Sequence, residues 1–186
     1  MCKSHNSYGG TRLMASKIKV DQLETADGSG TIALQNQLSG MTSASMPTGS
    51  TLQVLSHHHT SGSNVNTTST SYVATGLTKT ITPSATSSKI KIDISFYADV
   101  DTTGAAAFFT IKRGSDSLGG ATRNAGTGLA LVANGRLLTG LSITYLDSPS
   151  TTSATTYSLH MKADGGTVRY RPDEAVCALI LTEIAG

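Results

Sequence analysis

After Thr51 the chain alternates between apolar and polar side chains with a period of two, the pattern of β-strands that bury one face. Residues 89–96 show it most clearly, because three isoleucines and Phe96 fall on one face and polar side chains on the other. Residues 107–113 repeat it with Phe109 and Ile111 on the inner face. Further segments with strand character are residues 52–55, 71–82 (one or two short strands around Gly76), 129–133, 137–145, 157–161, 167–171 and 176–181.

Two short runs of turn residues predict hairpins between neighbouring strands. Asn134-Gly135 follows one apolar segment and precedes the next, and both residue types adopt positive φ easily, as a tight hairpin turn requires. The run 164–166, Asp-Gly-Gly, has the same place between two later segments. With strands at this spacing, we expect an all-β fold: a jelly-roll-like antiparallel β-sandwich head over residues 50–186.

The last predicted strand differs from the others because residues 176–181 are apolar on both faces. Such a strand needs cover on two sides. It is either a central strand within the domain or a strand whose outer face meets a neighbouring subunit, and the pattern leaves both open.

Residues 16–49 carry too few apolar side chains for a core of their own, yet residues 17–21 and 31–35 both alternate like strands. Residues 27–30 form a turn signal between them, and helical periodicity is confined to one turn at 35–38. An isolated two-stranded hairpin is only marginally stable. We therefore expect a short N-terminal β-hairpin or extended attachment arm that pairs with another chain, followed by a linker over residues 40–49.

Residues 1–15 show neither period and predict an unstructured extension, or a segment upstream of a true start at Met14. Cys2 and His5 have too few partners there for a metal site. Cys2 and Cys177 lie in unlike settings, which argues against a disulfide, and Cys177 is expected to be a small buried side chain.

The composition narrows the function classes. Only 14% of the 186 residues are charged and the net charge is +2, so no nucleic-acid-binding surface is expected. No apolar run is long enough to span a membrane, and the first residues do not resemble a secretory signal. These features predict a chain made in the cytoplasm without membrane insertion.

Catalytic motifs are absent from the sequence, which has no phosphate-binding glycine loop, no nucleophile elbow and no metalloprotease motif. Asp99 and Asp101 share a strand face, and Asp173 and Glu174 are adjacent. We expect the first pair to be solvated near a loop, with cation binding through their oxygens as an alternative. The chain is therefore predicted not to be an enzyme, with no catalytic residues and no bound cofactor.

One histidine cluster is a candidate metal-binding site. If the strand that begins near Leu52 continues through residues 57–59, then His57 and His59 point to the same face. Three chains around an axis would then present six imidazoles to a transition metal. A polar strand end without metal is the alternative interpretation of the same residues.

The remaining aromatic residues and loops predict core and contact surface. Strand alternation points Tyr145, Tyr157 and Tyr170 inward, with their hydroxyls at the edge of the core. Loops on a rigid sandwich commonly carry binding residues. The candidate binding loops are residues 99–104, 114–128 and 147–156.

Several longer phrases together resemble tail-fibre-type virion proteins of tailed bacteriophages, particularly those of marine and cyanobacterial hosts. They are the arm SKIKVDQLETADGSGTIALQNQ, the linker MPTGS leading into TLQV, the run TSTSYVATGLTKTITPSATSSKIKIDISF and the ending LILTEIAG. The resemblance spans most of the chain from Ser16. It implies an N-terminal attachment segment and a C-terminal β-sandwich head, a homotrimer in most members, displayed on the virion.

The predicted function is that of a phage virion structural protein. It is expected to be a tail fibre or fibre-like appendage, anchored on other virion proteins through residues 16–49 and able to contact a host-surface glycan or protein. A capsid decoration or head-fibre protein is one alternative, because related heads occur there too. A carbohydrate-binding or carbohydrate-cleaving module is the other.

Overall fold

The computed structural model describes residues 46–59, 62, 64–118, 126–130 and 135–186. The predicted extension 1–15 and the arm 16–49, apart from residues 46–49, lie outside the described residues. The described part is all-β, as predicted, and contains eleven strands. They are β1 (Thr51–His59), β2 (Val65–Thr67), β3 (Val73–Ile81), β4 (Lys89–Val100), β5 (Ala106–Arg113), β6 (Asp116–Ser117), β7 (Thr127–Ala130), β8 (Leu137–Asp147), β9 (Thr155–Asp164), β10 (Val168–Tyr170) and β11 (Cys177–Ile184).

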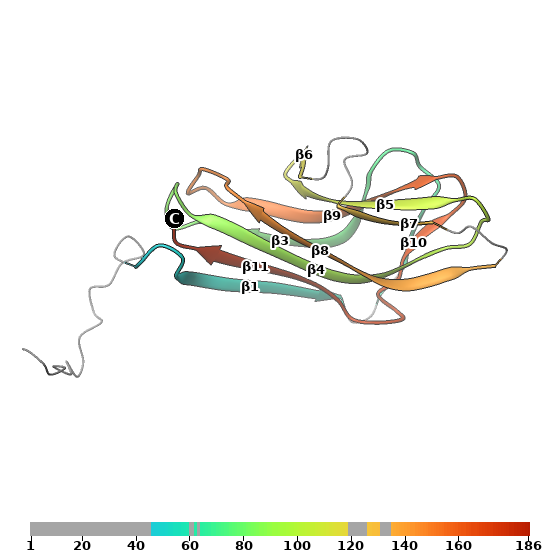
Figure 1. Cartoon of the computed structure of the whole chain (residues 1–186), viewed down its shortest axis with the longest axis horizontal. Coiled ribbons are helices and arrows are strands. Elements are labelled where there is room, and N and C mark those ends of the chain that lie inside the picture. The colour runs from blue at the N-terminus through green and yellow to red at the C-terminus, as the bar shows by residue number, and fades with distance from the viewer. Residues whose placement is uncertain (1–45, 60–61, 63, 119–125, 131–134) are drawn as a thin grey trace, which may run out of the picture. The chain divides into compact units, whose positions relative to one another are not determined.

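The strands form two antiparallel sheets, which we call sheet A and sheet B. In sheet A, β4 pairs with β8 along one side, while its other side pairs with β11 over residues 89–95 and with β10 over residues 98–100. β1 pairs with β11, and β2 pairs with β10. Figure 1 shows β1, β11 and β4 running side by side.

Sheet B has the order β3–β9–β5, and the short strands β6 and β7 share the outer edge of β5. The two sheets face each other across one apolar core, so the predicted two-layer β-sandwich is present. The jelly-roll arrangement of its connections remains a prediction.

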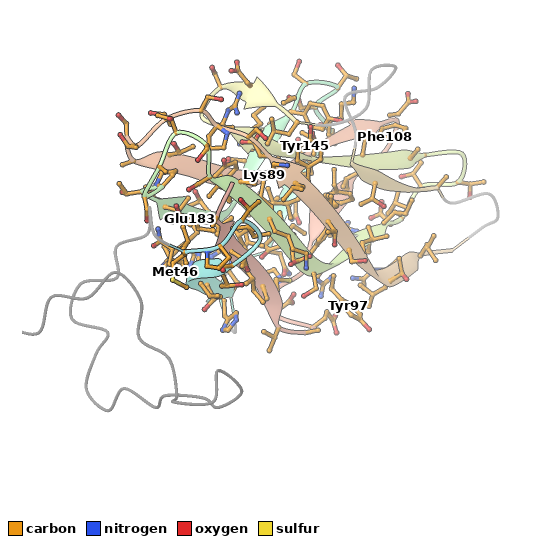
Figure 2. The ribbon with its side chains drawn as sticks, turned by 60° about the vertical axis from the view of Figure 1, so that its left-hand side comes forward. Met46, Lys89, Tyr97, Phe108, Tyr145 and Glu183 are labelled. Atoms are coloured by element: carbon orange, nitrogen blue, oxygen red, sulfur yellow. The ribbon has the colours of Figure 1, made fainter. Side chains whose placement is uncertain are left out.

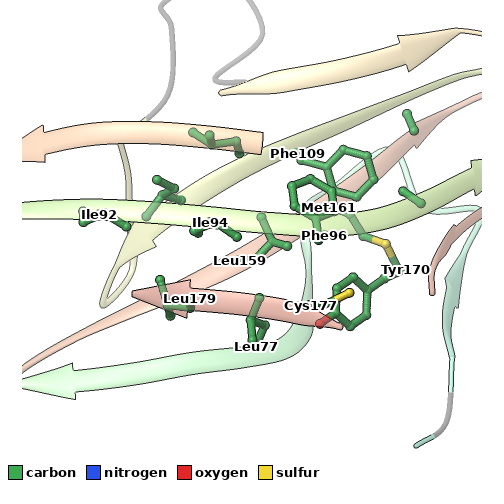
Figure 3. Close-up of a cluster of buried hydrophobic side chains, with 14 of the residues drawn as sticks. Leu77, Ile92, Ile94, Phe96, Phe109, Leu159, Met161, Tyr170, Cys177 and Leu179 are labelled. Atoms are coloured by element: carbon green, nitrogen blue, oxygen red, sulfur yellow. The ribbon is translucent and has the colours of Figure 1, made fainter. Parts of the chain in front are cut away.

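The core lies between the sheets and contains the side chains that strand alternation placed inward. Ile90, Ile92, Ile94 and Phe96 of β4 are at most 2% exposed, and Phe96 packs on Phe109 with ring centroids 4.7 Å apart. Figure 3 shows this cluster from both sheets. The other buried side chains from both sheets include Leu77, Ile81, Ile111, Leu159, Met161, Val168, Leu179 and Leu181.

The segment predicted as one or two strands around Gly76 is a single strand, β3. Its pairing with β9 shifts register between Ala74 and Thr78, and Gly76 has a φ of +85° inside this irregularity. A β-bulge with a glycine at positive φ bends a strand without ending it. The glycine that suggested a break therefore marks a bulge.

Both predicted hairpins are wrong. β7 pairs with β5 in sheet B, whereas β8 pairs with β4 in sheet A. β9 likewise belongs to sheet B and β10 to sheet A. The turn around Gly165 and Gly166, both at positive φ, therefore carries the chain from one sheet to the other. Turn residues indicate where the chain reverses, but tertiary packing decides which sheet receives the next strand.

The doubly apolar last strand, β11, is a central strand of sheet A between β1 and β4. On its inner face Cys177, Leu179 and Leu181 are fully buried, and the prediction of a buried, unpaired Cys177 is confirmed. On its outer face Ala178 and Ile180 are partly exposed. The first of the two explanations, a central strand within the domain, accounts for its place in the sheet.

Candidate functional site

A charged cluster occupies the outer face of sheet A where β4 meets β10. Asp99 alternates with the inward side chains of Ala98 and Val100, so its carboxylate points outward, yet it is fully buried. Three guanidinium groups cover it. The Nε of Arg136 lies 2.8 Å from Oδ2, Nη1 of Arg169 2.9 Å from Oδ1, and Nη1 of Arg171 3.1 Å from Oδ2.

The prediction that Asp99 is solvated is therefore wrong. Sequence periodicity placed it on the solvent face of the strand correctly, but the arginines that exclude water come from β10, from the residue after it and from the residue before β8. The alternation of Arg169 and Arg171 on one face of residues 167–171 was a signal that could have suggested basic partners for an outward carboxylate.

Further acids complete the cluster. Arg169 also donates a hydrogen bond to Asp101, and this hydrogen bond holds the pKa of Asp101 below its ordinary value. Arg171 binds Asp173 through two nitrogens, at 2.9 and 3.0 Å, and lowers the pKa of Asp173 to about 2. Its Nη2 also donates to Glu174 at 2.6 Å. The cluster is thus a shared ion-pair network in which each carboxylate accepts from a guanidinium.

A second buried carboxylate, Asp147, links the two sheets. It ends β8 in sheet A and accepts hydrogen bonds from Nη1 of Arg113 on β5, at 3.0 Å to both oxygens. The Tyr157 hydroxyl of β9 donates to it at 2.6 Å. Burial, together with the carboxylate, raises the pKa of Tyr157 far above its ordinary value, so the phenol stays protonated and remains a donor.

A third buried carboxylate, Glu183 of β11, accepts its hydrogen bonds from neutral groups. Gln53 Nε2 donates to Oε2 at 2.5 Å, while the backbone N–H of Ser84 donates to Oε1 at 2.6 Å and its hydroxyl to Oε2 at 3.2 Å. Burial raises the pKa of Glu183, but these donors together outweigh it and hold the pKa below the ordinary value. Sequence analysis did not single out this residue.

His57 and His59 lie on the same face of β1, as predicted, because the strand does continue through them. That face points toward β3: Nδ1 of His57 lies 2.7 Å from the carbonyl oxygen of Thr78. Nδ1 of His59 lies 3.1 Å from the Tyr170 hydroxyl, and a Cβ added at Gly76 would stand 3.5 Å from the His59 ring. Both imidazoles thus contact their own chain at the edge of the core.

The two rings meet edge to face with centroids 4.8 Å apart. Burial, and then the nearby His57, lower the pKa of His59, which favours the neutral imidazole that metals bind. Within the described residues no group of three or more His, Cys, Asp or Glu side chains is arranged to hold a metal ion. The inter-chain metal site therefore remains a prediction, and metal analysis of the wild type beside a His57→Ala/His59→Ala variant tests it.

A shallow hollow of about 190 Å³ lies over sheet B, lined by Thr70, Phe108, Lys162, Ala163 and Asp164. The Lys162 ammonium lies 4.8 Å from the ring centroid of Tyr72 and 5.8 Å from that of Phe108. The hollow thus combines one aromatic ring with a cation and a carboxylate at the surface. Figure 2 shows Phe108 well away from Glu183 and Met46.

The hollow lies outside the loops predicted to contact a host surface, and it is formed by strands β5 and β9 with the segment before β3. Of the three tyrosines predicted to be inward, Tyr157 and Tyr170 are fully buried. Tyr145 is 39% exposed. It is paired opposite the buried Ile92 and so has the inward register, but it belongs to a strand at the edge of its sheet, where cover is incomplete.

No family model matches the chain, and no curated protein matches it. One solved structure that matches is described as "Structure of infectious bursal disease virus Gx strain". The alignment has 12% sequence identity and a TM-score of 0.39, and covers 84% of this chain and 42% of that one. The chain thus spans less than half of the length of that protein.

Within the described residues there is no helix long and apolar enough to cross a membrane.

Proposed function

We propose that this chain is a virion structural protein of a tailed bacteriophage, a fibre or fibre-like appendage held to the particle by residues 16–49. The observation that most supports a structural role is the hydrogen bonding of the buried carboxylates. Asp99, Asp147 and Glu183 are the buried acids of the described residues, and each accepts three or more hydrogen bonds, at least one of them from another strand. General acid–base catalysis needs a carboxyl group that can reach a substrate.

The phrases that resemble tail-fibre proteins supply the second support. They extend over the predicted arm, the linker and the sandwich, so they concern the arrangement of the whole chain rather than one motif. In this proposal the arm attaches and the sandwich presents its surface outward. The linker meets the sandwich beside the C-terminus, where the Gly49 amide donates to the carbonyl of Ala185 at 2.7 Å.

Deletion of residues 1–45 tests the role of the arm. The deletion leaves every described contact of the sandwich in place, so the truncated chain should fold, and it should be missing from purified particles. Full-length protein expressed at the same level is the control. Incorporation of the truncated chain at the level of the full-length chain would overturn the attachment role.

The number of copies per particle separates a tail component from a capsid decoration protein, the first alternative. Shell proteins occur in far higher copy number than tail fibres, so quantitative gel analysis of purified particles distinguishes them. Labelling of the chain in electron micrographs gives an independent readout, because label on the shell would favour the head-fibre alternative.

Host-surface contact is the further part of the proposal, and the hollow beside Phe108 favours a glycan as the ligand. The ring of Phe108 offers an apolar surface to a sugar, and Lys162 offers hydrogen bonds to its hydroxyls. Phe108→Ala should weaken binding to host polysaccharide, whereas Tyr145→Ala, an exposed aromatic on the other sheet, should not. Equal binding by both variants would remove this site. Turnover of the polysaccharide would instead favour the carbohydrate-cleaving alternative.

A further inference from the structure

β8 is an edge strand with an unusual degree of exposure. It pairs with β4 along its whole length without any shift of register. The Leu137–Val100 pair lies at one end and the Asp147–Ile90 pair at the other. Among the described residues no strand pairs with its other side. β8 therefore leaves the outward-pointing backbone donors and acceptors of alternate residues unpaired within the described part of the chain.

The composition of β8 contains few of the devices that keep edge strands apart. Its sequence, LLTGLSITYLD, has no lysine, arginine or proline. Its one charged residue, Asp147, points inward to Arg113 and Tyr157. Natural edge strands are normally protected by charge, proline, bulges or short length.

The other edges of the sandwich have such protection. β3 carries Lys79 and the bulge at Gly76, and β1 has a register shift between Thr51 and Gln53. β2 is only three residues long, and the outer edge of β5 is occupied by β6 and β7. The contrast makes β8 the edge most suited to a further strand.

Exposed apolar side chains gather on the same strand. Of the five large hydrophobic residues exposed in the described part, Leu138, Tyr145 and Leu146 belong to β8. Leu138 and Leu146 lie on the outer face, opposite Asp99 and Lys91 of β4, and Tyr145 lies on the inner face. A strand that pairs with β8 should therefore bring apolar side chains to both faces.

We propose that β8 pairs with β8 of a second copy, antiparallel and across a two-fold axis at Ser142. This register overlaps the strand along its whole length and places the exposed Leu138 of one copy opposite the exposed Leu146 of the other. On the inner face it places Leu141 opposite Ile143 and Thr139 opposite Tyr145. Sheet A of both copies then forms one continuous antiparallel sheet.

A second copy fits better than a strand of the chain's own arm. The segments 17–21 and 31–35 are each five residues long and apolar on one face only, so either would cover half of the β8 edge and one of its faces. β8 itself matches in length and has apolar side chains on both faces. This inference does not depend on the proposed virion function.

Sedimentation equilibrium of the full chain tests the pairing. The wild type should form dimers, and Ser142→Lys should raise the dimer dissociation constant by more than about tenfold, because two ammonium groups would meet at the axis. Ser142 is exposed, and no side-chain hydrogen bond ties it to another described residue, so the fold should tolerate the change. Ser56→Lys is the matched control, since Ser56 is also exposed on the outer face of an edge strand.

Cross-linking gives the register. In a Cys2→Ser background, Ser142→Cys should form a disulfide-linked dimer under mild oxidation, whereas Ser56→Cys should not. A monomer at all concentrations would overturn the proposal, as would a trimer or other oligomer that is unaffected by Ser142→Lys and lacks the Ser142→Cys link. The last outcome would favour the homotrimer predicted from sequence, or the arm as the occupant of β8.

Discussion

Asp99 and Glu183 are both fully buried carboxylates in sheet A, but their surroundings neutralise them in different ways. Asp99 points outward and is covered by guanidinium groups from three arginines. Glu183 points inward and accepts hydrogen bonds from Gln53 and Ser84, both neutral. Desolvation of a charge is costly in both cases, and is offset by opposite charge in the first and by fixed dipoles in the second.

The two carboxylates respond differently to substitution because their partners differ in charge. Removal of Asp99 leaves cations close together without their shared partner, so the arginines repel one another. Removal of charge from Glu183 leaves only hydrogen-bond donors to satisfy, and these lack net charge. Truncation of Asp99 should therefore lower the stability of the fold more than truncation of Glu183. Protonation of Glu183 should be the simpler to follow, because its partners are neutral.

The largest effect is expected for Asp99→Ala. It should lower the free energy of unfolding by about 3 kcal/mol, near the low end for a broken buried ion pair, because Arg169 and Arg171 keep other acidic partners. Urea unfolding followed by circular dichroism measures this. Asp93→Ala is the control: its ion pair with Lys91 is partly exposed and should contribute less than about 1 kcal/mol. Equal effects of both variants would contradict the role of burial.

Glu183→Gln should have a smaller effect, about 2 kcal/mol, because one or more of the donors from Gln53 and Ser84 would face an amide NH2 instead of an oxygen. The same unfolding measurement applies. Glu174→Gln, at a surface site held by Arg171, provides the matched control and should change stability little. If Glu183→Gln is as stable as the wild type, the neutral donors are not what stabilises this carboxylate.

The pH dependence of stability should separate the same two regions. The pKa of Glu183 is lowered from 4.5, so its contribution is present above about pH 4.5 and is lost as the pH falls through the folded-state pKa. Asp101 and Asp173 are lowered from 3.8, so the contribution of the arginine cluster is lost only below that pH. Thermal unfolding measured between about pH 6 and pH 2 should therefore show stability beginning to fall below about pH 4.5 in the wild type, and only below about pH 3.8 in Glu183→Gln.

The smallest effect is expected for Arg136→Ala. Arg136 is the most exposed of the three arginines on Asp99, with 43% of its side chain accessible, and water and salt screen its charge. The loss should be under about 1 kcal/mol and should shrink further in about 1 M salt. Arg171→Ala, whose side chain is 12% exposed, should cost more. A larger loss for Arg136→Ala than for Arg171→Ala would mean that side-chain exposure does not determine how much each arginine contributes to stability.

Much of the fold was predictable from residue patterns. The alternation in β4 and β5 placed Ile90, Phe96, Phe109 and Ile111 inward, and all four are buried. The same rule placed His57 and His59 on one face. These predictions succeed because the pleat of a strand is a local property, so the sequence of a strand alone decides which side chains share a face.

The predictions that failed all concern partners distant in sequence. Asn134-Gly135 and the turn near Gly165 predict hairpins, although the flanking strands belong to different sheets. The sequence pattern predicts a solvated Asp99, although arginines at distances of 37 to 72 residues along the chain cover it. No local pattern specifies which edge a strand joins, because that choice depends on the packing of the whole domain.

Residue alternation along the chain was enough to predict the all-β fold, the apolar faces of its strands and the burial of Cys177. The packing of the strands adds what alternation does not show: within the described residues β8 lies at an edge of sheet A, Asp99 is enclosed by arginines and Glu183 is held by neutral donors. The two kinds of feature differ in the distance along the sequence over which they are determined. Alternation acts over two residues, whereas burial, ion pairing and strand order depend on groups that folding brings together from far along the chain.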